Sequence, residues 1–293
     1  MPMAGERRTM RYRARVIDMP LSGEGAAAPA ARAARAARAI APSLRERYDR
    51  LDAWRGVAIA WMACFHFSFD LNLPEFGYLV PHQNFGADSF WSGQRFCIVS
   101  LFLLGAGASQ AVALDLGQGW RRFWRRWGQV AGSALLVSAG SALMFPHSWI
   151  SFGVLHGIAV MLLAVRALGS RLPPARLGRS ALSSLGVFAL AATCWILPHV
   201  AAHPFFDARA TNWVGLVTHL PITEDYVPVL PWLGTMLAGY LAASWLLVHA
   251  RHILTGPLHE SLRSLAVLGR WSLVFYLLHQ PILIGLVMLV HAL

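Results

Sequence analysis

The residues best suited to chemistry lie in one apolar segment, residues 47–72. This segment is apolar enough to cross a bilayer, yet it contains Asp52, Arg55, His66 and Asp70. On a helix that turns by about 100° per residue, these four side chains fall within a wedge of about 60°. Ionisable groups inside a membrane are costly, and by default they face the protein interior and serve a function. The stripe therefore indicates chemistry, or transport, across the bilayer.

The composition is that of a protein embedded in a membrane. Hydrophobic residues make up 56% of the 293 residues and charged residues only 13%, whereas soluble domains are about 25% charged. The basic residues are all arginine, which excludes a phosphate-binding or Schiff-base lysine. The sequence therefore predicts an all-α fold, a polytopic transmembrane helical bundle in a lipid bilayer.

About seven segments are long enough to span the membrane, at roughly 20 residues each. Arginines gather in alternate loops between them, and Arg95 and Arg209 alone fall on the opposite side. By the positive-inside rule, the N-terminus is cytoplasmic and the C-terminus lies outside. This distribution explains the net charge of +11 without a nucleic-acid partner. The predicted spans lie near 52–72, 90–114, 127–145, 150–168, 181–199, 228–248 and 270–291.

Residues 1–47 form a separate region that is basic and rich in alanine and arginine. Arginine recurs every third residue at positions 32, 35 and 38, and the leucine-rich core of a signal peptide is not seen. We expect a disordered or partly helical tail, or alternatively an arginine face that lies on anionic lipid. The transmembrane domain is then residues 48–293. Nothing in the sequence sets the oligomeric state.

Five blocks of sequence carry a resemblance to a known family. Together they resemble the bacterial branch of the heparan-alpha-glucosaminide N-acetyltransferase catalytic-domain family, within the transmembrane acyltransferase superfamily. The blocks follow one another in the same order and at the same membrane positions as in that family. They are LDAWRGVAIAWMACFHFSFDL at 51–71, SLFLLGAGAS at 100–109, SFGVLHGIAV at 151–160, DYVPVLPWLG at 225–234 and LGRWSLVFYLLHQPIL at 268–283.

The resemblance implies acyl transfer across a bacterial inner membrane. The donor would be acyl-CoA, in particular acetyl-CoA, used from the cytoplasmic side. The acceptor would be a hydroxyl or amine of a sugar or other envelope component on the outer side. No metal is predicted. The alternative class is a proton-coupled transporter or exporter of a small polar solute, but the sequence has an odd number of spans and no inverted repeat.

The resemblance also gives roles to ionisable residues. Arg55 and His66 are 11 residues apart, or about 16 Å along a helix at ~1.5 Å per residue, which resembles the reach of a pantetheine arm. Arg55 is expected to bind a donor phosphate as a fixed cation, joined by Arg270. His66 is expected to take the proton from the attacking acceptor, while Asp70, four residues later, holds its ring.

Each of these roles has an alternative. An arginine at the inner edge of a span often serves only to fix its orientation, and a membrane histidine can be a simple interhelical hydrogen-bond partner. Asp52 is expected to pair with Arg55 or to cap the helix. The resemblance implies an active histidine in the first outer loop, where this chain has His82. Both His66 and His82 therefore stay open as the catalytic histidine.

A further group of residues is expected to bind the acceptor near the outer side. Arg95 lies just inside the second span and is expected to pair with an acid or to hold an anionic substrate. Asp225, Tyr226 and Trp232 belong to a proline-containing block that enters a span, where they line the outer mouth or form an interfacial aromatic belt. His279 lies near the middle of the last span, where a following proline loosens the helix and favours a cavity.

Overall fold

The computed structural model describes residues 48–72, 80–86 and 88–291, and these belong to one compact unit. The predicted basic tail, residues 1–47, lies outside the described residues. Residues 73–79, which form most of the first outer loop, lie outside them too. The description that follows concerns the transmembrane domain alone.

The described chain is all-α, as predicted, and it contains no strand. Each predicted span corresponds to a long helix, because only a helix pairs every backbone group within one apolar segment. The long helices are α2 (Asp49–Asp70), α3 (Ser89–Asp115), α4 (Trp120–Met144), α5 (Val154–Arg171), α7 (Ala181–Val200), α8 (Val229–His249) and α11 (Ser272–His291). Between them lie α6 (Pro174–Leu177), η2 (Pro204–Asp207), η3 (Asn212–Val214), α9 (His252–Thr255), η4 (Glu260–Leu262) and α10 (Arg263–Arg270).

Five of the long helices are long and apolar enough to cross a membrane by length and composition, namely α3, α5, α7, α8 and α11. The protein is therefore a multi-pass membrane protein. Helices α2 and α4 are 22 and 25 residues long and fall outside this set. The count of seven spans and the orientation of the termini accordingly stay predictions.

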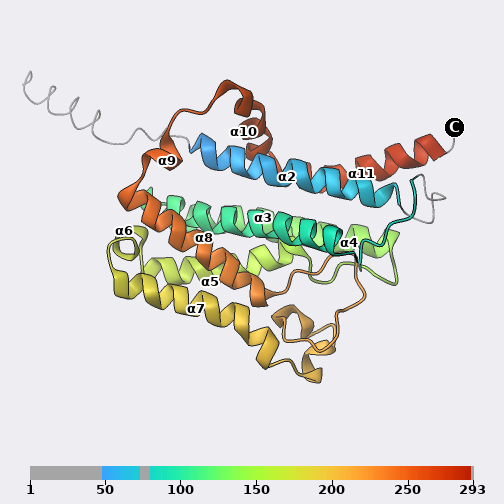
Figure 1. Cartoon of the computed structure of the whole chain (residues 1–293), viewed down its shortest axis with the longest axis horizontal. Coiled ribbons are helices and arrows are strands. Elements are labelled where there is room, and N and C mark those ends of the chain that lie inside the picture. The colour runs from blue at the N-terminus through green and yellow to red at the C-terminus, as the bar shows by residue number, and fades with distance from the viewer. Residues whose placement is uncertain (1–47, 73–79, 87, 292–293) are drawn as a thin grey trace, which may run out of the picture. The chain divides into compact units, whose positions relative to one another are not determined.

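The long helices run side by side, with α2 and α11 at one edge and α7 at the other (Figure 1). Helices α3 and α8 pack together in the middle, and α2 packs on α3, α10 and α11. The largest side chains of the core are fully buried around this central pair. They include Leu103 of α3, Met161 of α5, and Met236, Leu237 and Tyr240 of α8.

Glycines let α3 and α8 approach until their backbones touch. A Cβ atom on Gly107 would lie 2.0 Å from the carbonyl oxygen of Met236, and one on Gly239 would lie 2.2 Å from that of Leu104. Small residues at helix contacts are typical of membrane bundles, where close packing replaces the hydrophobic effect. The SLFLLGAGAS block therefore holds α3 against α8.

We predict that Gly107→Ala lowers the thermal unfolding temperature of the purified protein. The added methyl group must push the two backbones apart, and overpacking of this kind costs about 1–3 kcal/mol. The matched control is Gly132→Ala on α4, where a Cβ atom meets nothing within 4 Å. Equal unfolding temperatures for the two variants would contradict the assigned packing of α3 on α8.

The predicted last span, 270–291, corresponds to α11 except for its first two residues. Helix α10 ends at Arg270 and α11 begins at Ser272, so Arg270 does not belong to the span that carries His279. Instead, α10 packs on α2 through two glycines. A Cβ atom on Gly269 would lie 1.7 Å from the carbonyl oxygen of Asp52, and one on Gly56 would lie 1.9 Å from that of Leu265. This contact places Arg270 beside the first turns of α2.

Candidate functional site

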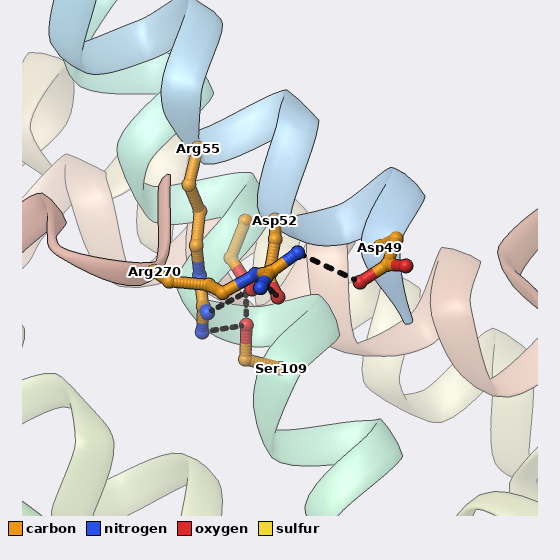
Figure 2. Close-up of polar contacts among 6 residues, drawn as sticks. Asp49, Asp52, Arg55, Ser109 and Arg270 are labelled. Atoms are coloured by element: carbon orange, nitrogen blue, oxygen red, sulfur yellow. Dashed lines mark hydrogen bonds and ion pairs between the residues drawn. The ribbon is translucent and has the colours of Figure 1, made fainter. Parts of the chain in front are cut away.

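The first turns of α2 carry a cluster of opposite charges, which Figure 2 shows together with Ser109 of α3. Arg55 Nη1 donates to Asp52 Oδ1 over 3.1 Å, and Arg270 Nε lies 3.8 Å from Asp52 Oδ2. Arg270 Nη2 also donates to Asp49 Oδ1 over 3.4 Å. The structure thus brings together the two arginines predicted to bind the donor, and Asp52 pairs with Arg55 as expected.

Arg55 points toward α3, where its Nη2 donates to Ser109 Oγ over 2.6 Å. The hydroxyl of Ser109 in turn donates to the carbonyl oxygen of Gly105 over 2.5 Å, so the guanidinium is held in one orientation. Its side chain as a whole is 31% exposed. A guanidinium fixed in orientation is suited to phosphate recognition.

A third arginine belongs to this end of the site. The positive charge of Arg55 acts through space on Arg126 of α4. In the sequence, Arg126 is one of the arginines that gather in alternate loops, within RRFWRRW at 121–127, and nothing there sets it apart. Two like charges held near each other repel, and an anion between them would relieve that repulsion. We refer to Arg55, Arg126 and Arg270 as the arginine cluster.

Further along α2, His66 lies against His279 of α11. Their ring centroids are 5.1 Å apart at an interplanar angle of 60°. Aromatic rings surround the pair, because Phe65 packs edge-on against His66 at 5.8 Å and Phe275 stacks on His279 at 6.2 Å. The two histidines therefore meet in an apolar setting, although they are 213 positions apart in the sequence.

The hydrogen bonds of His279 identify its tautomer. Its Nδ1 lies 2.7 Å from the carbonyl oxygen of Tyr276, and a carbonyl can only accept, so Nδ1 carries the hydrogen. In the neutral ring the lone pair is then on Nε2, which is buried and has no hydrogen-bond partner in the described structure. A buried lone pair of this kind can accept a proton from a group that is brought beside it.

Asp70 is fully buried, but it contacts α11 rather than the ring of His66. Its Oδ1 accepts a hydrogen bond from Gln280 Nε2 over 2.7 Å, and its Oδ2 is buried without a partner in the described structure. The expected hydrogen bond from Asp70 to His66 is not among those that the structure shows. Asp70 and Gln280 instead join α2 to α11 next to the histidine pair. We call His66, Asp70, His279 and Gln280 the histidine cluster.

Asp225 has a structural partner on the outer side, at the N-terminus of α5. Its Oδ2 accepts a hydrogen bond from the backbone N–H of Val154 over 2.7 Å, so it satisfies a free donor at the start of that helix. Burial raises the pKa of Asp225 to about 6, against the opposing effects of the Val154 bond and the positive charge of Arg95. The positive charge of Arg95 therefore acts on Asp225 through space, and the pairing of Arg95 with an acid stays a prediction.

The stability of the protein should fall as the pH rises from about 4 to about 6. In this range the folded state binds a proton at Asp225 that the unfolded chain, with its pKa near 3.8, has released. A shift of about two pKa units corresponds to at most about 3 kcal/mol. Asp225→Asn keeps an oxygen for Val154 and removes the titration, so its unfolding temperature should depend less on pH across this window.

The matched control for that experiment is Asp207→Asn. Hydrogen bonds from the side chain and backbone of Thr218 hold the pKa of Asp207 below its ordinary value, despite some loss of solvation. This group stabilises the fold above its unfolded pKa and loses that effect at lower pH, the opposite sign. An unchanged pH slope in Asp225→Asn would contradict the assignment.

The other predicted acceptor residues occupy the same outer region. The hydroxyl of Tyr226 donates to the carbonyl oxygen of Asn212 over 2.7 Å, and its pKa is raised to about 12 by burial and by the charge of Asp207. Trp232, in the first turns of α8, contacts the ring of Phe96 at 5.3 Å. Each of the two aromatic residues therefore has a partner within the protein, Asn212 for Tyr226 and Phe96 for Trp232.

One link connects the outer region with the histidine cluster. His82 lies in the described outer segment 80–86 and is exposed. That segment is joined to the end of α2, because the side chain of Asn72 exchanges two hydrogen bonds with the backbone of Gln83.

The fold and the site define a class of protein, a multi-pass membrane protein with polar residues at two levels of α2. The arginine cluster lies near the start of α2 and the histidine cluster near its end. The chain matches the family described as "Heparan-alpha-glucosaminide N-acetyltransferase, catalytic" over residues 47–281, and it belongs to that family. No curated protein and no solved structure matches it. The match includes all five sequence blocks except the last two residues of the final one.

Membership of this family establishes the general activity. The family is an acetyltransferase family, so the protein is a transferase with an acetyltransferase type of function in a membrane. The family uses acetyl-CoA as its donor. This supports a transferase over the transporter that the sequence had left as an alternative.

Proposed function

We propose that the protein transfers an acetyl group from cytoplasmic acetyl-CoA to a hydroxyl or amine of a sugar or other envelope component, on the outer side of a bacterial inner membrane. The observation that carries this proposal is that one continuous helix, α2, contributes residues to both clusters. Arg55 and His66 of α2 are 11 residues apart, about 16 Å at ~1.5 Å per residue. An extended donor held by its phosphates at one cluster would present its thioester at the other.

The arginine cluster is suited to the phosphates of the donor. Arg55 and Arg270 share the single carboxylate of Asp52, and Arg126 adds a further positive charge nearby. Asp49 offsets part of the charge of Arg270. Charge-assisted hydrogen bonds from guanidinium groups to phosphate are about twice as strong as neutral ones. An anionic donor is therefore bound at this end.

The histidine cluster is suited to general-base catalysis. The acceptor O–H or N–H loses its proton to the His66–His279 pair, in which Nε2 of His279 carries the oriented lone pair. The acceptor oxygen or nitrogen forms its bond to the acetyl carbonyl carbon, the carbon–sulfur bond breaks, and CoA leaves as the thiolate, which then takes up a proton. Asp70 and Gln280 hold α2 and α11 together around the pair.

The outer residues are proposed to hold the acceptor. Arg95 and Asp225 supply opposite charges on that side, and Tyr226 and Trp232 supply aromatic surface of the kind that stacks on sugar rings. In this arrangement the acceptor reaches the histidine pair from outside while the donor reaches it from the cytoplasm.

The test is to titrate acetyl-CoA into the purified protein and to follow acetyl transfer in sealed vesicles of known orientation. We expect saturable binding, and transfer to an added sugar acceptor only when acetyl-CoA is on the side that bears the arginine cluster. Failure of the folded protein to bind acetyl-CoA would reject the proposed donor. Transfer that needs donor and acceptor on the same side would reject the crossing of the membrane.

A further inference from the structure

Arg166 of α5 is a buried cation without a counter-charge. Only 3% of its surface is exposed, and its Nη2 donates to the backbone carbonyl oxygen of Gln118. Its Nε and Nη1 are buried without a hydrogen-bond partner among the described residues, and no carboxylate of that part of the chain pairs with it. Buried charges in proteins are paired or bind an ion, because an unpaired charge is costly to bury. Two N–H donors of Arg166 are therefore available to an anion.

The guanidinium of Arg166 lies against the first turn of α4. Its Cζ is 5.1 Å from the ring centroid of Trp120 and 5.4 Å from that of Phe123. These rings stabilise a cation through their π faces, but they carry no net charge and do not neutralise it. Trp120 is itself 44% exposed, which places the guanidinium close to the protein surface.

The N-terminus of α4 has unused donors as well. Its N-cap is Gly119, which has no side chain to accept a hydrogen bond, and the first N–H with an acceptor is that of Phe123, bonded to the carbonyl oxygen of Gly119 over 3.2 Å. The N–H groups of residues 120–122 have no acceptor within the described chain. A Cβ atom on Gly119 would meet nothing within 4 Å, so the space beside the N-cap is open.

These two sets of donors together match a phosphate group. The guanidinium and the helix N-terminus both attract negative charge, and the helix end alone is equivalent to about half a positive charge. Phosphate oxygens accept several hydrogen bonds at once, and both arginines and helix N-termini bind them. Arg121 and Arg122, which are exposed on the same turn, add two further positive charges.

The site lies at the level of a membrane surface, whichever side of the membrane that is. Gln118 follows the end of α3 by three residues, Arg166 precedes the end of α5 by five, and both helices are candidate spans. The exposed rings of Trp120 and Trp124 stack beside it at 6.1 Å, and tryptophan is typical of the membrane interface.

We propose that Arg166 and the first turn of α4 bind the phosphate of a membrane phospholipid. Phospholipid phosphates lie at the membrane surface, where the structure places these donors. The site shares no residue with the arginine cluster or the histidine cluster, and it does not depend on the proposed function.

The experiment uses the delipidated full chain in detergent, and native mass spectrometry follows the binding of dioctanoyl phosphatidylglycerol. We expect saturable binding to the wild type, and Arg166→Gln should raise the Kd by about tenfold or more, because the interaction with a charged group is lost. The matched control is Arg171→Gln, which removes the same charge from an exposed position of α5 and should change the Kd by less than about twofold. Equal losses in the two variants would overturn the proposal.

A second pair of variants tests the helix end and leaves Arg166 in place. Arg121→Pro and Arg121→Ala both remove the arginine side chain, but only the proline also removes the backbone N–H. Proline is tolerated in the first turn, where that N–H has no partner within the helix. We expect Arg121→Pro to bind the phospholipid about threefold or more weakly than Arg121→Ala does. Equal Kd values for the two variants would contradict the proposed site.

Competition experiments identify the ligand. Dioctanoylglycerol has the same hydrocarbon chains without the phosphate, and it should not displace the phospholipid. If it does, the chains alone are recognised and the proposal is wrong. Free CoA should not displace the phospholipid either. Displacement by CoA would assign these donors to the phosphates of the acetyl donor and would also overturn the proposal.

Discussion

His66→Ala is expected to lower kcat for acetyl transfer by about 10²–10⁴-fold while leaving the affinity for acetyl-CoA unchanged. The range is the usual contribution of a general base. The binding is expected to persist because the arginine cluster lies about 16 Å away along α2. Steady-state transfer rates and acetyl-CoA titrations on the same purified variant separate the two effects.

The neighbouring histidine sharpens this prediction. Because the rings of His66 and His279 lie in contact, they should act as a unit, and His66→Ala/His279→Ala should lose little more activity than either single variant. Simple multiplication of the two losses would contradict a shared role. Full activity in His66→Ala, with activity lost in His82→Ala, would move the catalytic base to the outer loop.

Arg55→Ala is expected to raise the Kd for acetyl-CoA by about 10- to 150-fold. Hydrogen bonds to a charged group contribute about 1.5–3 kcal/mol, and each 1.4 kcal/mol is a factor of ten. The change removes the guanidinium that Ser109 orients, whereas Asp52 keeps Arg270 as a partner. Isothermal titration with acetyl-CoA and with free CoA should give losses of similar size, because the two molecules share their phosphates.

The control for Arg55 is Arg263→Ala. Arg263 belongs to α10 and pairs with Glu260, and both side chains are strongly exposed, at 69% and 83%. The Arg263→Ala substitution therefore removes one positive charge from a neighbouring helix and leaves the arginine cluster unchanged. If Arg263→Ala weakens binding as much as Arg55→Ala does, the effect reflects overall charge and not a defined phosphate site.

The course of the long helices could be predicted because each follows from its own apolar run. Helix α3, for example, was expected at 90–114 and extends over Ser89–Asp115. The break between α10 and α11 could not be predicted in the same way. Helix α10 packs on α2 through the contact of Gly269 with the backbone of Asp52, two residues more than 200 positions apart in the sequence. Arg270 therefore reaches Asp52 through packing that no local pattern records.

For the site, the positions of residues along one helix could be predicted, but their partners on other helices could not. The helical period placed Arg55 and His66 on one face of α2, and it also placed Asp70 one turn beyond His66. It did not predict that Asp70 would pair with Gln280 of α11, since a single sequence carries no information on which helices are neighbours. For the same reason it did not predict that Asp225 would accept a hydrogen bond from the backbone N–H of Val154 at the start of α5.

Helix α2 is unbroken over 22 residues, so it fixes the distance between the residues along it. Arg55 and His66 cannot approach or separate, because the helix between them has a fixed rise of ~1.5 Å per residue. In the proposed function, a donor would then be selected by the length between its anionic end and its reactive carbon, and not only by the chemistry of either end. Thioesters with a shortened or lengthened arm would still bind to the arginines, yet they would hold the acyl group at the wrong height for the histidines.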